Sequence, residues 1–350
     1  MNLRLNYFDW RLVLPILFLL LLGIVVIWAL APQLVTYQIV FVVISAIVFL
    51  IISRTDYKVF QALHLPIYVV GVVSLLLPFI FGAASRGAHR WLQFGNINIQ
   101  PSEITKPFFI LTFAIVASGL SKSKLPALLG LFLVPAGIIF IQPDLGTTMV
   151  LGVAWFAILA SQVPFKNILA GAVILVLVSP LGWFILRDYQ RDRLITFVNP
   201  YHDPLGRGYH VIQSVIAVGS GQILGRGLGQ GTQSNLKFLP ESHTDFIFAS
   251  LSENLGFIGG LLVVGLLTIV LQRIWYTSRI AADRSASLYC LAVMGMIAFQ
   301  SYVNIGMNMG IVPITGITLP FLSYGGSSLL SLAVTLGLVH SIAIHSERQF

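Results

Sequence analysis

Residues 12–30 read LVLPILFLLLLGIVVIWAL and contain no charged side chain. About 20 consecutive apolar residues in a helix are enough to cross the hydrocarbon core of a bilayer. Similar runs recur along the chain of 350 residues, of which 57% are hydrophobic and only 9% charged. A soluble domain of this size would carry roughly 25% charged residues. The sequence therefore predicts an all-α polytopic membrane protein.

The hydrophobic runs predict about ten transmembrane helices in a single integral membrane domain that covers residues 1–350. We place these spans near residues 12–31, 34–52, 63–81, 104–120, 125–141, 145–161, 167–186, 246–271, 287–308 and 321–344. The connection between spans 7 and 8, residues 187–245, is too long to be a turn. We expect it to form a long extracytoplasmic loop.

Basic residues in the short connections predict the orientation. Those on one side of the predicted spans are Arg4, Arg11, Arg54, Lys58, Lys122, Lys124, Lys166, Arg273, Arg279 and Arg284. The positive-inside rule makes this side cytoplasmic, so both termini are expected in the cytoplasm. The same distribution explains the net charge of +8 and argues against nucleic acid as a partner, because no basic stripe is interleaved with aromatic residues.

Several kinds of chemistry are not expected. Cys290 is the only cysteine, which excludes an intramolecular disulfide and a CxxC site. The histidines show no zinc-binding spacing, and the glycines between residues 219 and 231 fit neither GxGxxG nor GxxxxGK[ST]. We expect no nucleotide, haem or structural zinc, and we expect these glycines to allow close backbone packing within the loop.

The acidic residues are distributed unevenly across the predicted membrane. Eight of the twelve carboxylates are expected on or near the outer face, namely Glu103, Asp144, Asp188, Asp192, Asp203, Glu241, Asp245 and Glu253. A charge within a span costs about 2.5–3.5 kcal/mol on insertion scales. Solvated loops would not require acids at the ends of spans, so this pattern predicts a polar site that opens outward.

One group of candidate residues surrounds the start of the fourth predicted span. Glu103 and Lys106 lie three residues apart in QPSEITK, where they can pair on one face of a helix. They either complement the helix dipole or hold a cation ready for an anionic substrate. Arg90 and Trp91 lie just upstream and suit a phosphate beside a sugar, although Arg and Trp are also common interface anchors.

A second group of candidates lies where later spans begin. Asp144, in QPDLGT, is expected to be at least a helix N-cap. Asp245, in LPESHTDFIF, could cap the eighth span, but Glu253 lies about two turns deeper and needs a polar partner or a cavity. Ser323 belongs to PFLSYGGSS, whose Pro and Gly predict a broken start to the last span. That segment either lines the site or packs helices through small residues.

These motifs resemble a known family over essentially the whole chain. They are RGAHRWL (86–92), QPSEITK (100–106), QPDLGT (142–147), NPYHDPLGRGYHVIQS (199–214), GQGTQSNLKFLPESHTDFIF (229–248) and NIGMNMG with PITGITLPFLSYGGSSLL (304–330). In this order they resemble the SEDS proteins (shape, elongation, division, sporulation). GTQS before FLPE and the short N-terminal segment are more similar to elongation members than to division members. One departure is Asn254, where the family commonly has a second acid beside Glu253.

The resemblance implies a ten-helix glycosyltransferase that polymerises lipid II outside the bacterial cytoplasmic membrane, for cell elongation and rod shape. It also implies a single-span class B penicillin-binding protein transpeptidase as partner, within the elongation machinery. The family's catalytic acid corresponds to Asp245, and its acid–base pair corresponds to Glu103 and Lys106.

The chemistry of such a reaction fits the candidate residues. Pyrophosphate leaves as a stable anion, so one base for the acceptor hydroxyl and cations for the phosphates are sufficient. We expect Asp245 to act as this base or to hold a divalent cation, Mg²⁺ or Mn²⁺. Arg90, Lys106 and Arg193 are expected to bind pyrophosphate, with Glu103 positioning Lys106.

Two alternatives remain from other classes of function. A flippase for the same lipid would also place polar groups between spans, but its ionisable residues should reach the cytoplasmic face. A scaffold for cell-wall enzymes would not explain charges at the ends of spans. The outward bias of the acids favours the polymerase.

Overall fold

The computed structural model describes residues 8–82, 90–95, 97–119, 125–164, 166–171, 173, 177, 188–203, 206–236 and 238–346. The first half of this chain forms α1 (Trp10–Leu30), α2 (Pro32–Arg54), α3 (Tyr57–Ala62), α4 (His64–Phe81), α5 (Pro101–Ser118), α6 (Leu125–Ile141) and α7 (Leu145–Ala160). The second half forms α9 (Asp188–Val198), a short 3-10 helix at Pro200–His202, α10 (Arg207–Ser220), α11 (Thr232–Asn235), α12 (Ile247–Ile280), α13 (Arg284–Asn308) and α14 (Gly326–Ser346).

Polar caps at the ends of apolar runs decide where several helices start. Asp9, Asp56, Asp144 and Asp283 each accept a hydrogen bond from a backbone N–H in the first turn of α1, α3, α7 and α13. The N-cap interpretation of Asp144 is thus confirmed. Proline occupies the first position of α2 and α5, where no intrahelical N–H bond is lost.

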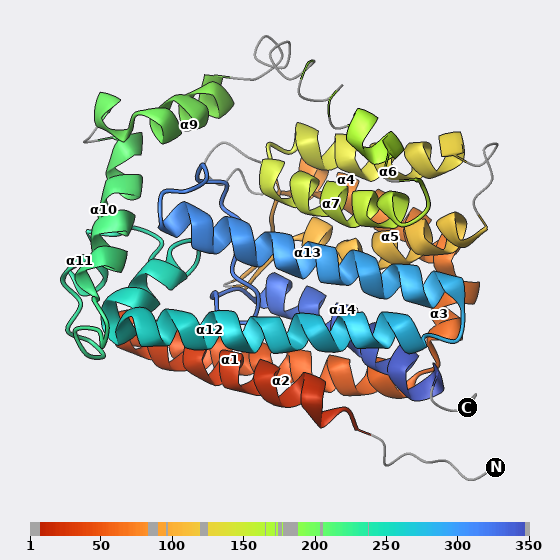
Figure 1. Ribbon diagram of the computed structural model, residues 1–350, viewed down its shortest axis with the longest axis horizontal. Helices are drawn as coiled ribbons and strands as arrows, with labels where there is room; N and C mark the ends of the chain where they lie inside the picture. The colour runs from red at the N-terminus through yellow and green to blue at the C-terminus, as the bar shows by residue number, and fades with distance from the viewer. Residues whose placement is uncertain are drawn as a thin grey trace.

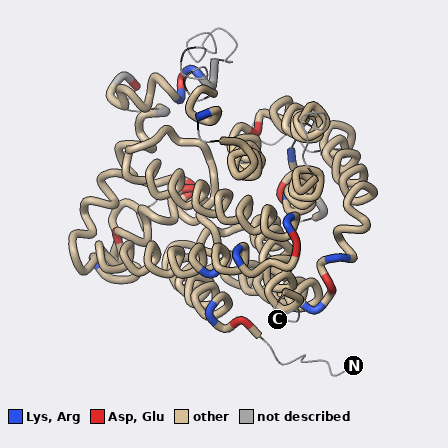
Figure 2. The backbone as a smooth tube through the Cα atoms, turned by 45° about the vertical axis from the view of Figure 1, so that its right-hand side comes forward, with Lys and Arg blue, Asp and Glu red and all other residues tan. Residues whose placement is uncertain are grey.

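Among the described residues, six helices are long and apolar enough to cross a membrane, namely α1, α2, α4, α12, α13 and α14, and α6 and α7 are shorter apolar helices. The nearly all-helical membrane fold is therefore confirmed. The predicted span at 167–186 falls largely outside the described residues, so the count of ten stays a prediction. In Figure 2 the charged segments are sparse and separated by long uncharged stretches of helix.

A short β-hairpin interrupts the otherwise helical chain between α4 and α5. Strands β1 (Leu92–Phe94) and β2 (Ile97–Ile99) form an antiparallel hairpin, with Leu92 opposite Ile99. Gly95 has a φ of +59°, the left-handed conformation that a tight turn requires. Because the segment lies between spans, its backbone is free to form a ladder instead of a helix.

Helices α13 and α14 lie at the centre of the bundle, and their apolar windows are 61% and 78% buried. In Figure 1, α13 runs between α12 and the α5–α7 layer, and α14 lies behind it. Asn304, Asn308 and Thr335 on these two helices are fully buried. Central helices with buried polar groups differ from the lipid-facing helices, since those amides and hydroxyls need partners inside the protein.

The two ends of the bundle are formed by different segments of the chain. The ends of the chain, α3 and the α12–α13 connection lie at one end, while α10 and α11 lie at the other (Figure 1). At the first end, the Arg273 guanidinium bonds Asp9 at 2.6 Å and the Tyr57 hydroxyl donates to Asp283 at 2.6 Å. The candidate site lies towards the second end, where α5, α7, α12 and α14 begin.

Candidate active site

Asp245 lies in a turn directly before α12. The backbone N–H groups of Thr244 and Phe246 both donate to the carbonyl of Glu241, which has a φ of +53°. The Thr244 hydroxyl also donates to the Glu241 carboxylate at 2.9 Å. Residues 241–246, which we call the acidic turn, are therefore held together locally, with Asp245 half-buried at their end.

The acidic turn packs on a second turn that precedes α14. The Ser323 hydroxyl donates to the Thr244 carbonyl at 2.8 Å and accepts the Leu319 N–H at 2.8 Å. The Tyr324 N–H donates to the His243 carbonyl at 2.9 Å, and the two rings make an edge contact. Ser323 is only 4% exposed, so the structure places it beside Asp245 as a bridge between turns.

An irregular segment, residues 311–319, passes beside Asp245, and we call it the strap. A methyl group added to Gly316 would lie 3.5 Å from Oδ2 of Asp245, and Gly316 has a φ of +75°. The Arg193 guanidinium of α9 donates to the carbonyl of Thr315 at 3.2 Å. Two consecutive residues of the strap thus contact different partners: Gly316 lies against Asp245, and Thr315 bonds Arg193.

Glu103 and Lys106 form the ion pair that their spacing predicted. The Lys106 ammonium lies 2.8 Å from both carboxylate oxygens of Glu103, in the first two turns of α5. The side chains are only 3% and 13% exposed, for Lys106 and Glu103 respectively. A pair so little exposed is screened weakly by solvent and holds the lysine in one position.

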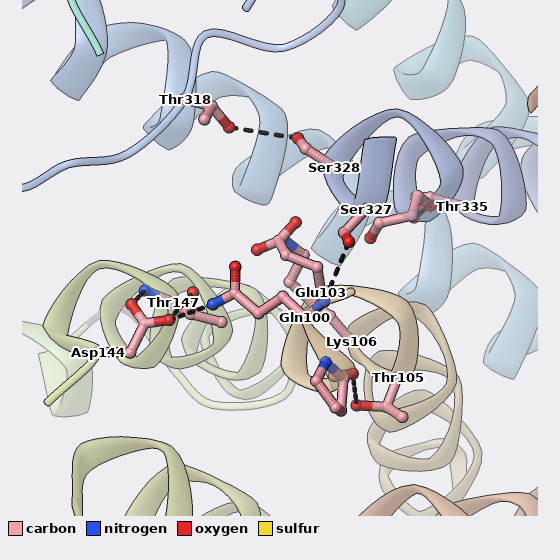
Figure 3. A network of polar contacts seen from close by, with 12 residues as sticks. Gln100, Glu103, Thr105, Lys106, Asp144, Thr147, Thr318, Ser327, Ser328 and Thr335 are labelled. Carbon is pink, nitrogen blue, oxygen red and sulfur yellow. Dashed lines mark hydrogen bonds and ion pairs between the residues drawn. The ribbon is translucent and has the colours of Figure 1, made fainter. Parts of the chain in front are cut away.

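A network of buried polar groups links this pair to α7 and α14 (Figure 3). The Gln100 side chain donates to Asp144 at 2.6 Å, and its backbone N–H donates to the Ser327 hydroxyl at 3.0 Å. The Arg90 guanidinium lies 3.9 Å from Asp144. The Arg90 Nε is buried without a hydrogen-bond partner among the described residues. Trp91 follows it, half-buried at the start of the hairpin.

The strap connects this network to Asp245. Gly146, two residues after Asp144, packs so closely on the strap that an added methyl group would lie 3.0 Å from the Ile317 side chain and 3.4 Å from the Thr315 carbonyl. The hydroxyls of Thr318 and Ser328 bond at 3.2 Å. Asp245 and the α5–α7 network therefore contact the same short segment, as a common site requires.

The structure places Glu253 in different surroundings. Its carboxylate is fully buried and accepts the N–H groups of Gln233 and Ser234 at 2.8 and 2.9 Å, and the Ser234 hydroxyl at 2.6 Å. These donors belong to the first turn of α11. The polar partner that Glu253 needed is therefore the loop that precedes the acidic turn.

The glycine-rich part of the loop packs backbone against backbone on α12, as its composition predicted. Gly256 interrupts α12 with a φ of +68°. Methyl groups added to Gly221 and Gly225 would lie 1.9 and 2.2 Å from the carbonyl oxygens of Ser252 and Asn254. No side chain fits there. Asn254 uses both ends of its amide, donating to Ser250 and accepting from Gly229, so the amide satisfies two partners.

Arg193 also lines a pocket of about 270 Å³ between α9, α10 and the strap. The other residues around it are Thr196, Phe197, His210, Val211, Val312, Pro313 and Ile314. Arg193 and Gly146 therefore both lie against the strap at Thr315, and Arg193 also faces the pocket. Arg86 and His89, which the sequence placed near Arg90, lie outside the described residues.

The electrostatics of the acidic turn favour a neutral His243. Burial lowers the pKa of its imidazole from the ordinary 6.5, although the neighbouring Glu241 acts in the opposite direction. In the described part of the chain, no three side chains of His, Cys, Asp or Glu gather closely enough to hold a metal ion. The divalent cation at Asp245 therefore stays a prediction.

Two functional asparagines of α13 were not identified from the sequence. Asn304 and Asn308 are fully buried, and each side-chain NH₂ donates to the backbone carbonyl of Asp245, at 3.0 and 3.1 Å. Two amides four residues apart in an apolar span were the available signal, because such groups need buried partners. Nothing local in the sequence indicated that the partner would be Asp245.

The fold and site define a helical membrane protein with a carboxylate and a buried acid–base network at one end of its bundle. The profile of the FtsW, RodA and SpoVE family, described as cell cycle proteins, matches residues 10–348, and the chain belongs to this family. The resemblance that the motifs indicated is confirmed.

Curated relatives and solved structures agree with this family. The chain is 36% identical to the peptidoglycan glycosyltransferase MrdB of Escherichia coli K12, covering 97% of this chain and 95% of that protein. It is also 36% identical to the probable peptidoglycan glycosyltransferase FtsW of Bacillus subtilis, covering 85% and 77%. A chain of a peptidoglycan synthase complex that couples polymerization and crosslinking superposes with a TM-score of 0.82 at 32% identity, covering 96% and 97%. The rod shape determining protein RodA of Thermus thermophilus superposes at 0.72 with 26% identity, covering 98% of each chain.

Proposed function

We propose that this protein is a peptidoglycan glycosyltransferase that polymerises lipid II into glycan strands at the outer face of the bacterial cytoplasmic membrane. The enzyme class agrees with the names of relatives that match along nearly the whole chain. The observation that carries the mechanism is the fixed acidic turn, which holds Asp245 against the strap. MrdB matches 97% of this chain and the Bacillus subtilis FtsW matches 85%, which supports a role in elongation.

Asp245 is the general base of the proposed reaction. It takes the proton of the acceptor sugar hydroxyl, whose oxygen then bonds the anomeric carbon of the donor. The bond from that carbon to the pyrophosphate oxygen breaks, and the lipid pyrophosphate leaves as an anion. One carboxylate is sufficient because this leaving group needs no proton, whereas the sugar alkoxide of a glycosidase does.

Cations of the α5–α7 network stabilise the departing pyrophosphate. Lys106 supplies an ammonium that Glu103 holds in place, and Arg90 supplies a guanidinium with a buried, unpaired Nε among the described contacts. Preorganised cations in a site with little water stabilise developing negative charge without rearranging. Arg193, which donates to the Thr315 carbonyl of the strap, adds a further cation, and Trp91 packs beside the headgroup.

The proposed topology has ten spans, both termini in the cytoplasm and residues 187–245 outside. Multiple apolar helices and the relatives support a multi-pass protein of the bacterial inner membrane. The termini share one end of the bundle and α10 and α11 occupy the other (Figure 1), which is the arrangement that this topology requires. Because the short connections at the end that holds the termini are rich in Lys and Arg, the positive-inside rule assigns that end to the cytoplasm.

The proposed partner is a class B penicillin-binding protein transpeptidase, with which the chain forms part of the elongation machinery. A likeness to a chain from a complex that couples polymerization to crosslinking supports this partner. The pairing has a chemical reason, since newly made glycan must be crosslinked close to where it leaves the polymerase.

The proposed function is tested by incubating the purified protein, with and without its transpeptidase partner, with lipid II. Wild type should make glycan polymer on a resolving gel, and Asp245→Asn should make none. The control is Asp56→Asn, because Asp56 caps α3 at the opposite end and asparagine caps a helix equally well. Full activity of Asp245→Asn would remove Asp245 as the base. No polymer from wild type with the partner and divalent cations, but lipid movement across vesicles, would favour a flippase.

A further inference from the structure

Phe246, the N-cap residue of α12, provides no side-chain cap, and the first turn of α12 is capped by a side chain of α13. In an α-helix the N–H of one residue donates to the carbonyl four residues earlier. Ser250 follows this rule with Phe246 at 3.1 Å. The pair one residue earlier, Ala249 and Asp245, bonds to the side chain of Asn308 instead.

The amide of Asn308 bonds both the N–H group of Ala249 and the carbonyl group of Asp245. Its Oδ1 accepts the Ala249 N–H at 3.0 Å, and its NH₂ donates to the Asp245 carbonyl at 3.1 Å. An amide can replace the peptide hydrogen bond in this way because it carries a donor and an acceptor side by side. The helix therefore begins after Phe246, and Asp245 lies in the acidic turn.

Asn304 fixes Asp245 relative to the strap. Its NH₂ group has two hydrogens, and it donates to the carbonyls of Asp245 at 3.0 Å and Ile317 at 2.8 Å. Ile317 directly follows Gly316, the residue that lies against the Asp245 carboxylate. One amide therefore sets the spacing between the acidic turn and the strap.

The Ser214 hydroxyl holds the end of α13 in place. It donates to the backbone carbonyl of Asn308 at 2.9 Å and lies 3.4 Å from the Asn308 Oδ1. Asn308 has no exposed surface. Its amide therefore has a defined orientation, with the oxygen towards donors and the nitrogen towards carbonyls.

We propose that Asn308, assisted by Asn304, is a positioning residue that keeps Asp245 out of α12 and aimed at the strap. This inference rests on the proposed role of Asp245 as the base. Without the inserted amide, the Ala249 N–H can bond the Asp245 carbonyl directly, and Asp245 joins the helix. A shift of about 1 Å in a reacting group can cost about 100-fold in rate.

The first test compares Asn308→Leu with wild type in lipid II polymerisation by the complex with its transpeptidase. Leucine has the same branched arrangement of heavy atoms but no polar groups, so the first turn can close with its own hydrogen bond. We expect kcat to fall about 10- to 100-fold while KM stays within about twofold, because Asn308 acts on the base and not on substrate binding. The control is Gln300→Leu on the same helix, since Gln300 is buried and its Oε1 has no hydrogen-bond partner among the described residues. A kcat within about twofold of that control would overturn the proposal.

The second test uses Asn308→Asp, which keeps an acceptor for Ala249 and so remains a valid test if the leucine variant does not fold. An ionised carboxylate cannot donate to the Asp245 carbonyl, whereas a protonated one can. The ratio of variant to wild-type kcat should therefore rise as the pH falls and the introduced carboxyl takes up a proton. A ratio that stays constant between pH 5 and pH 8 would contradict a positioning role.

The Asp245→Asn variant separates the two proposals. If Asp245→Asn is inactive and Asn308→Leu is fully active, only the positioning role fails. If Asp245→Asn is active, the proposed base is wrong, whatever Asn308 does.

Discussion

Gly316 lies directly against the Asp245 carboxylate, and a single added methyl group would come within 3.5 Å of Oδ2. The residues are 71 positions apart in the sequence and meet because the strap passes over the start of α12. Gly316 therefore adds no side-chain atoms to the space beside this carboxylate oxygen.

Gly316→Ala should lower polymerising activity by at least about tenfold, because the methyl group occupies space next to the proposed base. Alanine in a left-handed conformation also costs about 1–2 kcal/mol. Gly229→Ala is a matched control for that cost, since Gly229 has a φ of +77° and open space where the methyl group would lie. Equal activity of the two variants would show that only backbone strain matters at Gly316.

Breaking the Glu103–Lys106 pair should destabilise the protein as well as reduce its activity. Glu103→Gln leaves an ammonium in a site that is only 3% exposed, which typically costs about 3–5 kcal/mol. The double variant Glu103→Gln with Lys106→Met should recover most of the stability but no activity, because the cation for pyrophosphate is gone. Thermal unfolding in detergent and polymer yield measure the two effects.

Lys58→Met is the control for the loss of a lysine, since Lys58 is exposed at the opposite end of the bundle. If the double variant polymerises lipid II at the wild-type rate, Lys106 has no role in binding pyrophosphate.

Glu253→Gln should act on the loop and not on the chemistry. Its amide nitrogen would face the N–H groups that now donate to the carboxylate, and each unsatisfied buried group costs about 1–3 kcal/mol. We expect faster hydrogen exchange in residues 221–236 and a smaller fall in kcat than for Asp245→Asn. Loss of activity as complete as that of Asp245→Asn, with unchanged exchange, would instead assign Glu253 to substrate binding.

Stability should decrease as the pH falls below about 6.5, the ordinary pKa of histidine. Burial lowers the pKa of His243 and of His210 in the folded protein, so the unfolded chain binds more protons between the folded and unfolded pKa values. Protonation therefore favours unfolding, and the stabilisation present above pH 6.5 is lost on acidification. His243→Gln with His210→Gln should flatten the unfolding free energy between pH 7 and pH 5. An unchanged slope in this double variant would contradict the assignment.

The motifs around the site were visible in the sequence, but only the contacts between residues close in the sequence could be predicted from them. The spacing of Glu103 and Lys106 predicted their pairing because residues three apart share a face of a helix. Asp144 was identified as a cap for a similar local reason. The partner of Glu253 could not be found in this way, since its donors begin 19 residues earlier along an irregular loop.

The sequence by itself determined the membrane class, the positions of most helices and the family. Each of these depends on local composition or on motif order, and an apolar run of about 20 residues has few alternatives to a spanning helix. Only the tertiary structure decided the surroundings of Asp245. Asn308 lies 63 residues from it and Gly316 lies on the strap, and both contacts depend on how α12 and α13 pack. Hydrogen bonds between distant segments leave no periodic pattern in a sequence, because they depend on the orientation of side chains across a packed interface.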